Sequence, residues 1–170
     1  MKKMILCAAA LVLGTPAFGQ SAKVFDFMGF DTETPTENPT MEGKACSISS
    51  EIAGKATCSS YGGLNLGDAK TSFVVIDLYD GKISSIIGSA KKYEFPALLE
   101  VFTAKYGSPK IEKTEWRNAA GAVIPNQKAT WTFKHGTLEL SAIGSRIGDT
   151  DFIFLNMANQ PPEKKADVNF

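Results

Sequence analysis

The chain has 170 residues, 44% of them hydrophobic, and carries 18 acidic and 18 basic side chains. Its length suits one domain, and its balanced charge argues against a dedicated nucleic-acid binder or a basic membrane-surface protein. Histidine occurs once and cysteine three times, at spacings that fit no zinc finger or ribbon. We therefore expect neither a metal site nor a cofactor.

Residues 1–19 have the order of a secretory signal peptide. Lys2 and Lys3 form a positive start, and the apolar run Met4–Leu13 is too short to cross a bilayer core of roughly 30 Å. Ala17-Phe18-Gly19 places small residues before a cleavage point. We expect cleavage after Gly19 and a periplasmic product, with no transmembrane segment later in the chain.

Residues 20–43 form an irregular lead-in, which Pro35 and Pro39 break. Residues 44–158 then read as a single domain, followed by a flexible tail over residues 159–170. The domain begins with two predicted strands, Lys44–Ser50 and Lys55–Tyr61, on either side of a loop centred on Ile52.

This hairpin register places Cys46 opposite Cys58, which is the arrangement that a cross-strand disulfide needs. Cys7 would be removed with the signal peptide, which leaves two cysteines. An even number of cysteines in an exported chain usually forms disulfides, because the compartment is oxidising. Closing a loop of about 13 residues would stabilise the fold by about 3 kcal/mol. The alternative is a pair of reduced thiols that pack as small apolar side chains.

The next segments predict a hairpin and then a helix. Ser72–Tyr79 is rich in β-branched and aromatic residues, and Asp80-Gly81 is a preferred type I′ turn before a return strand, Lys82–Gly88. A helix is predicted over residues 94–106, since Pro96 suits its first turn and Gly107 its end. Its apolar residues recur at helical spacing: Phe95, Leu98, Leu99, Phe102 and Tyr106.

Four further strands are predicted after the helix: Ile111–Asn118, Lys128–Lys134, Thr137–Ile143 and Asp151–Met157. The middle two alternate apolar and polar residues about a His135-Gly136 turn, which is typical of an antiparallel sheet with one buried face. We therefore expect an α+β fold, with an antiparallel sheet of about eight short strands and one amphipathic helix packed on it.

Two sequence echoes raise the hypothesis of an internal duplication. Tyr79–Ser89 resembles Lys134–Ser145, and Ile52-Ala53-Gly54 resembles Ala119-Ala120-Gly121. Because hairpins resemble one another for generic reasons, the hypothesis stays open.

Catalytic motifs are largely absent: the sequence has no nucleophile elbow, P-loop, dinucleotide fingerprint or zinc-protease motif. His135 is the one side chain that titrates near neutral pH, so a small secreted hydrolase would have to use it with a nearby carboxylate. A histidine beside a glycine is more often a turn residue, and we assign no catalytic residue.

Aromatic residues on the strands are the better candidates for function. Trp116, Arg117 and Asn118 combine a ring, a guanidinium and an amide, and Tyr61 and Tyr79 lie at strand ends. Such side chains offer large contact area with little rotamer entropy to lose, so we take these five as candidate binding residues. Trp131 and Phe133 are expected to fill the core under the helix.

The helix end Lys105-Tyr106-Gly107-Ser108-Pro109, followed by strands that carry Trp116 and Trp131, resembles small exported α+β envelope domains. These are the domains of the outer-membrane-assembly lipoprotein and β-lactamase-inhibitor protein type. The resemblance covers roughly residues 94–157, but those domains have a helix pair where this chain has one clear helix. It implies a protein-binding surface built on a sheet.

The sequence therefore predicts a soluble, exported and non-enzymatic binding or envelope-interaction module. Its expected partner is an envelope protein rather than a nucleic acid. The alternative is the small secreted hydrolase that uses His135.

Overall fold

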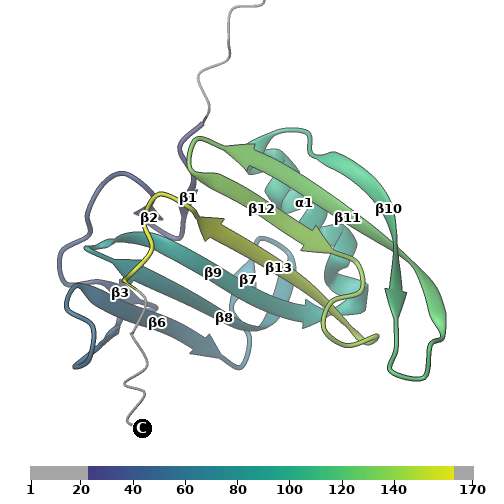
Figure 1. The fold of residues 1–170 in the computed structure, drawn as a ribbon, viewed down its shortest axis with the longest axis horizontal. Helices are drawn as coiled ribbons and strands as arrows, with labels where there is room; N and C mark the ends of the chain where they lie inside the picture. The colour runs from purple at the N-terminus through teal and green to yellow at the C-terminus, as the bar shows by residue number, and fades with distance from the viewer. Residues whose placement is uncertain (1–22, 163–170) are drawn as a thin grey trace, which may run out of the picture.

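The computed structural model describes residues 23–162, so the predicted signal peptide and most of the predicted tail lie outside the described residues. One large antiparallel sheet dominates the fold, in the order β10-β11-β12-β13-β9-β8-β6-β5, with β7 paired to β8 (Figure 1). Its strands are β5 (Ser47–Ile48), β6 (Lys55–Tyr61), β7 (Asn65–Leu66), β8 (Ala69–Tyr79), β9 (Lys82–Lys91), β10 (Lys110–Arg117), β11 (Val123–Phe133), β12 (Gly136–Ser141) and β13 (Asp149–Asn156). The sheet thus has nine strands rather than about eight, and the fold is mostly β.

Two meanders make up the sheet, and their last strands pair with each other. A short 3-10 turn, η1 (Lys92–Glu94), and the helix α1 (Phe95–Tyr106) lead from β9 to β10 at the far edge. The chain then returns through β11 and β12 to β13, which pairs antiparallel with β9 and sets Ile153 opposite Ile87. Strands distant in sequence therefore meet at the centre of the sheet.

The predicted helix and its end signals are confirmed. A proline occupies the first turn of α1, and Gly107 ends it at a φ of 90°, a backbone conformation that favours glycine. The Asp80-Gly81 turn is also confirmed, since both residues have the positive φ that a type I′ turn requires.

One face of the sheet is covered by α1, which buries Leu98, Phe102 and Tyr106 against it. The Phe102 ring meets Trp131 edge-on at a centroid distance of 5.8 Å and Phe152 at 5.3 Å. The indole Nε1 of Trp131 donates a hydrogen bond to the Gly107 carbonyl at 2.7 Å. The expectation that Trp131 and Phe133 fill the core is confirmed, because both are buried.

The lead-in covers the rest of this face. It contains two short ribbons, β1 (Asp26–Phe27) with β2 (Phe30–Asp31) and β3 (Thr40–Met41) with β4 (Lys44–Ala45). Phe25 stacks on Phe154 at 3.8 Å between ring centroids and also contacts the Tyr106 ring. The apolar part of the lead-in therefore belongs to the same core as the helix.

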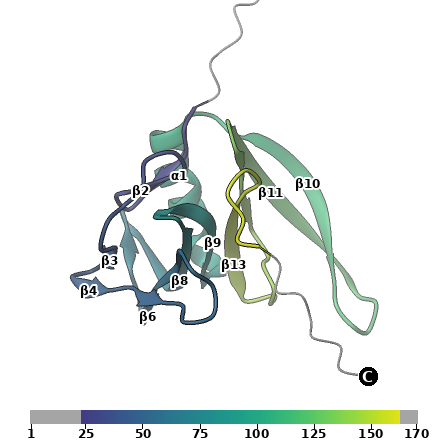
Figure 2. The same ribbon diagram turned by 60° about the vertical axis from the view of Figure 1, so that its left-hand side comes forward.

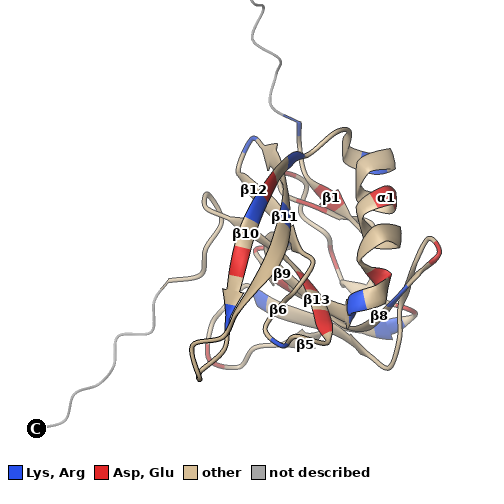
Figure 3. Ribbon diagram, turned by 90° about the vertical axis from the view of Figure 1, so that its right-hand side faces the viewer, with Lys and Arg blue, Asp and Glu red and all other residues tan. Residues whose placement is uncertain are grey.

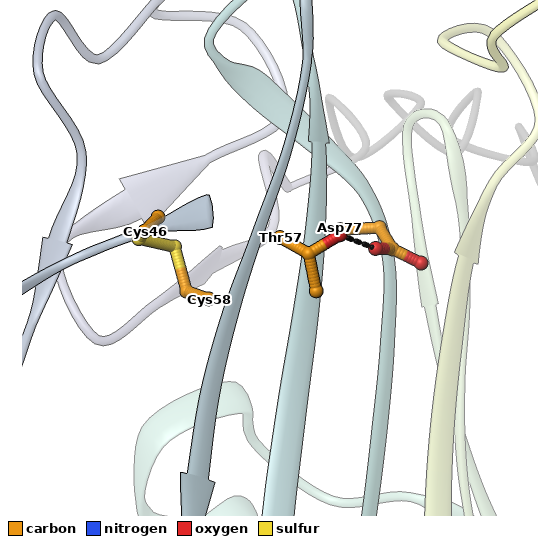
Figure 4. The surroundings of a disulfide bond; sticks show 4 residues. All are labelled: Cys46, Thr57, Cys58 and Asp77. Atoms are coloured by element: carbon orange, nitrogen blue, oxygen red, sulfur yellow. Dashed lines mark hydrogen bonds between the residues drawn. A yellow bond between two sulfur atoms is a disulfide. The ribbon is translucent and has the colours of Figure 1, made fainter. Parts of the chain in front are cut away.

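The disulfide between Cys46 and Cys58 is confirmed, with the two Cα atoms 4.4 Å apart (Figure 4). It continues the β5–β6 register, in which Ser47 lies opposite Thr57. The predicted strand Lys44–Ser50, however, is divided into β4 and β5, because β4 turns away to pair with β3.

Two other boundaries differ from the prediction. Strand β11 begins at Val123 rather than at Lys128, since Val123 pairs with Arg117 of β10. The β11–β12 turn is Lys134-His135 rather than His135-Gly136, because Phe133 pairs with Gly136. Within residues 23–162, no helix is long and apolar enough to cross a membrane.

The two echoes do not align with a single structural repeat. The echo of Tyr79–Ser89 matches the β8–β9 hairpin with the β11–β12 hairpin. The first echo therefore makes β12 the counterpart of β9. The shorter echo matches the β5–β6 turn with the β10–β11 turn, and counting strands onward from these turns makes β13 the counterpart of β9 instead. A duplication that includes both echoes would need one strand more in the first half than in the second.

Candidate functional site

The predicted binding residues fall in separate places. Trp116 is half-buried near the end of β10 and donates from Nε1 to the Gly144 carbonyl at 3.1 Å. Arg117 forms an ion pair with Glu115 at 2.8 Å, and the side-chain oxygen of Asn118 accepts a hydrogen bond from the Ala122 amide. The Asn118 bond closes the β10–β11 turn, the Trp116 bond joins β10 to the loop after β12, and the Arg117 ion pair stays within β10. Much of this trio's bonding capacity is therefore already used.

Tyr61 and Tyr79 lie at opposite ends of the β6–β8 pair, where Tyr61 faces Phe73 and Tyr79 faces Lys55. Tyr61 is 77% exposed, whereas Tyr79 is half-buried. Five strands lie between β6 and β10 in the sheet order. The structure therefore does not bring the five predicted residues into one site.

A groove runs between the β10–β11 hairpin and the start of α1. It consists of three adjoining hollows, the first beside η1 and α1 and the third at the distal hairpin. Lys92 and Ala142 line both the first and the middle hollow, and Lys113 and Pro125 line both the middle and the third. We call it the hairpin groove and define it by six residues: Lys92, Tyr93, Phe95, Lys113, Pro125 and Ala142.

The groove exists because the hairpin is longer than the helix that covers it. Alternate residues of β11 are buried from Ala129 onward (Ala129, Trp131 and Phe133), whereas none from Val123 to Lys128 is buried. Figure 2 shows the hairpin standing out from the rest of the molecule, and Figure 3 shows its tip reaching past the start of α1. The helix-facing side of the distal hairpin is therefore left without cover.

The groove has an apolar end at η1 and α1. Tyr93 is 77% exposed, Phe95 is half-buried, and Pro96 completes this hollow. Asn126, in the middle hollow, is fully engaged: its side-chain amide bonds to the backbone of Ile143 in both directions, at 2.9 Å and 2.7 Å. It joins the loop after β12 to β11 and so shapes the groove wall.

Lysine charge in the groove is not neutralised. Lys92 and Lys113 both line the middle hollow and are exposed, and neither forms an ion pair within the described part of the chain. Neighbouring lysines outside the groove do: Lys91 pairs with Asp149 at 3.2 Å, and Lys110 with Glu112 at 2.6 Å. The carboxylate that lines the third hollow, Glu115, is paired with Arg117. The groove therefore combines two free cations with an aromatic and aliphatic surface.

Sequence reasoning missed the groove because its residues come from four separated segments. The Lys91-Lys92-Tyr93 run before the helix was a visible signal, but alone it fits a solvated turn. Lys113 lies in a strand rich in charged residues, and nothing in the local sequence indicates that it lines a groove.

His135 does lie near a carboxylate. Its Nε2 is 3.3 Å from Oε1 of Glu33, and the same oxygen is 2.5 Å from Nζ of Lys134. The hydrogen bond from Lys134 is the main cause of the lowered pKa of Glu33. Over residues 23–162, no hydrogen bond joins His135 to a serine, threonine or cysteine side chain. The cluster ties the lead-in to the β11–β12 turn, and no activated nucleophile is part of it.

No cluster of three or more His, Cys, Asp or Glu side chains in the described ranges could hold a metal ion. Comparison with known proteins adds no relative: no family model, no curated protein and no solved structure matches this chain. The resemblance to envelope domains therefore stays a prediction.

Proposed function

We propose that the protein is an exported, non-enzymatic binding module of the cell envelope, which holds an extended acidic segment of a partner protein in the hairpin groove. The observation that carries the proposal is the pair of unneutralised lysines, Lys92 and Lys113, in a groove with an exposed aromatic end. Acidic side chains of the partner would lie at the lysines, and its apolar side chains would pack on Tyr93 and Phe95.

The two kinds of contact have different roles. A solvent-exposed lysine–carboxylate pair contributes only about 0.2–1 kcal/mol, so the lysines favour acidic ligands and speed their association. Burial of apolar surface, at about 25 cal/mol per Å², supplies most of the affinity. An open groove that buries little area suits a weak, reversible complex.

Export is supported by two features. Residues 1–19 have the charge, apolar run and small-residue pattern of a signal peptide. Disulfides persist mainly in oxidising compartments, and the Cys46–Cys58 pair fits a protein that works there. Mass measurement of the protein recovered from the periplasm should find a chain that begins at Gln20.

The groove can be tested with a labelled peptide of alternating glutamate and leucine, titrated with protein and followed by fluorescence anisotropy. The double variant Lys92→Glu, Lys113→Glu should weaken binding at least about tenfold. The matched control, Lys44→Glu with Lys55→Glu, makes the same change in net charge away from the groove and should bind like the wild type. Equal weakening in both variants, or equal binding of a lysine–leucine peptide, would refute the proposal.

A secreted hydrolase is the second candidate, and the contact between His135 and Glu33 favours it. The ion-pair cluster at an exposed turn fits a structural role better, because a nucleophile is missing from it. His135→Ala should change the free energy of unfolding by no more than about 0.5 kcal/mol and leave peptide binding unchanged. If it abolished a deletion phenotype while thermal unfolding stayed the same, the hydrolase would be the better explanation.

A further inference from the structure

The sheet face opposite α1 carries an apolar stripe at its centre. Val75 lies opposite Ile87, which lies opposite Ile153 on the neighbouring strand, and Leu155 continues the stripe along β13. Ile87, Ile153 and Leu155 are 45%, 49% and 44% exposed. We call this the bare face, because neither α1 nor the lead-in ribbons lie on it; it is turned toward the viewer in Figure 1.

The central strands have the pattern of strands that are buried on both sides. Apolar residues stand at consecutive positions in three of them: Val74-Val75 in β8, Ile86-Ile87 in β9 and Phe152-Ile153 in β13. The outer strand β12 instead alternates, with Leu138 and Leu140 buried and Glu139 between them on the other side. Continuous apolar runs are typical of strands covered on both faces, yet within residues 23–162 the helix and the ribbons cover only one face.

We infer that a second copy of this chain covers the bare face, so that the protein is a homodimer with its two sheets packed face to face. Such packing keeps the strand directions of the two sheets within about 30° of each other. This inference rests on the sheet and not on the hairpin groove, so it is independent of the proposed function.

The size of the bare face suits a stable dimer. Five adjacent strands, from β6 to β12, span about 24 Å at the usual spacing, and about seven residues of each span about 23 Å. This corresponds to roughly 550 Å² of sheet plane per copy, and side chains add to the accessible area. The total from two copies therefore comes close to the roughly 1,200–2,000 Å² of a specific interface.

The arrangement of the stripe makes the bare face complementary to itself. Ile87 and Ile153 lie side by side on β9 and β13, at the junction of the two meanders. A two-fold axis between the copies, parallel to these strands, reverses the strand order and places Ile87 of one copy against Ile153 of the other. Each copy would thus present the same patch, as a two-fold dimer requires.

Polar groups beside the stripe already have partners, which lowers the cost of covering them. The Asp77 carboxylate accepts a hydrogen bond from the hydroxyl of Thr57 at 2.6 Å (Figure 4) and another from that of Ser85 at 3.2 Å. On the other flank, Lys128 pairs with Glu139 at 2.8 Å. The stripe is therefore bordered by groups that need no new partner from the second copy.

Sedimentation velocity of the mature protein, from about 1 to about 100 µM, tests the inference. The wild type should sediment as a dimer, and Ile153→Glu should raise the dissociation constant at least about thirtyfold, because it places a charge at the centre of the interface. The matched control is Ile111→Glu, at a residue of similar exposure (46%) outside the bare face, which should remain dimeric. Circular dichroism should show both variants folded.

A rescue experiment separates loss of the interface from misfolding. Ile153→Glu and Ile87→Lys should each be monomeric alone and should form a mixed dimer when combined, because the two positions face each other across the axis. A wild type that is monomeric over the whole concentration range would overturn the inference. So would a dimer that tolerates Ile153→Glu, and a monomer whose bare face binds lipid vesicles or another protein instead.

Discussion

The two faces of the sheet are built from the same strands but differ in what covers them. On β8, Val74, Ile76 and Leu78 are fully buried under α1 and the lead-in, whereas Phe73 and Val75, on the other face, are only half-buried. Apolar residues occur on both faces, so composition does not distinguish them. Burial is therefore set by what the rest of the chain places on a face, and a bare apolar face indicates a missing partner.

The largest effect is expected at the centre of the covered face. Phe102→Ala should lower the free energy of unfolding by about 3–5 kcal/mol, because the buried ring packs on both Trp131 and Phe152. Denaturant unfolding measures this loss. A loss below about 1 kcal/mol would mean that the helix does not anchor the core, and the two faces would then be alike in stability.

The disulfide should contribute next. Reduction of the Cys46–Cys58 bond should cost about 3 kcal/mol, because it releases a constraint on the unfolded chain. The loss should add to that of Phe102→Ala within roughly 0.5 kcal/mol, since the two act by different mechanisms. Unfolding of both proteins with and without reductant tests this additivity, and a strong coupling between the two losses would contradict it.

One substitution made on each face measures the difference in burial between the two faces. Ile76→Thr, on the covered face, should cost about 2–4 kcal/mol, since it replaces a buried ethyl group with a hydroxyl. Ile153→Thr, on the bare face, should cost less than about 1 kcal/mol in a monomer, because about half of its surface already meets water. Both are measured by denaturant unfolding at the lowest practical concentration. Equal losses would show that Ile153 is as well covered in the monomer as Ile76.

The smallest effect is expected at the end of the helix. Tyr106 donates to the Asp26 carbonyl at 2.7 Å, so Tyr106→Phe should cost about 1 kcal/mol at neutral pH. Burial, and secondarily the charge of Asp26, raise the pKa of the Tyr106 hydroxyl above its ordinary value of 10.0.

The raised pKa sets the sign of the pH dependence. Below about pH 10 the hydroxyl is neutral in both states, and its contribution to stability is fully present. Above that pH the unfolded chain loses the proton first, so the free energy of unfolding falls. Tyr106→Phe should make this alkaline fall shallower, and an equally steep fall would contradict this assignment. Unfolding free energies measured between pH 8 and about pH 11 decide between these outcomes.

Sequence patterns predicted local features well where neighbouring residues determine them. The helix over residues 94–106, its proline and glycine ends and the Asp80-Gly81 turn follow from short-range geometry. The Cys46–Cys58 pairing also followed, because hairpin register is set by the loop between the strands. The β11 start and the His135 turn were misplaced by a few residues, since strand ends depend on the partner strand.

The candidate site was predicted poorly for a related reason. Trp116, Tyr61 and Tyr79 were chosen for their chemistry, but the tertiary structure separates them and engages Trp116 with Gly144. The hairpin groove joins Lys92, Ala142 and Lys113, which no local pattern connects.

By itself, the sequence determined the helix, the tight turns, the disulfide and the apolar character of the central strands, because these depend on residues close along the chain. Only the tertiary structure decided that β13 pairs with β9, that the lead-in shares the helix side and that the opposite face stays bare. Alternation within a strand tells which residues share a face. It does not tell which distant strand lies beside it, or which element covers that face, because these depend on the packing of the whole chain.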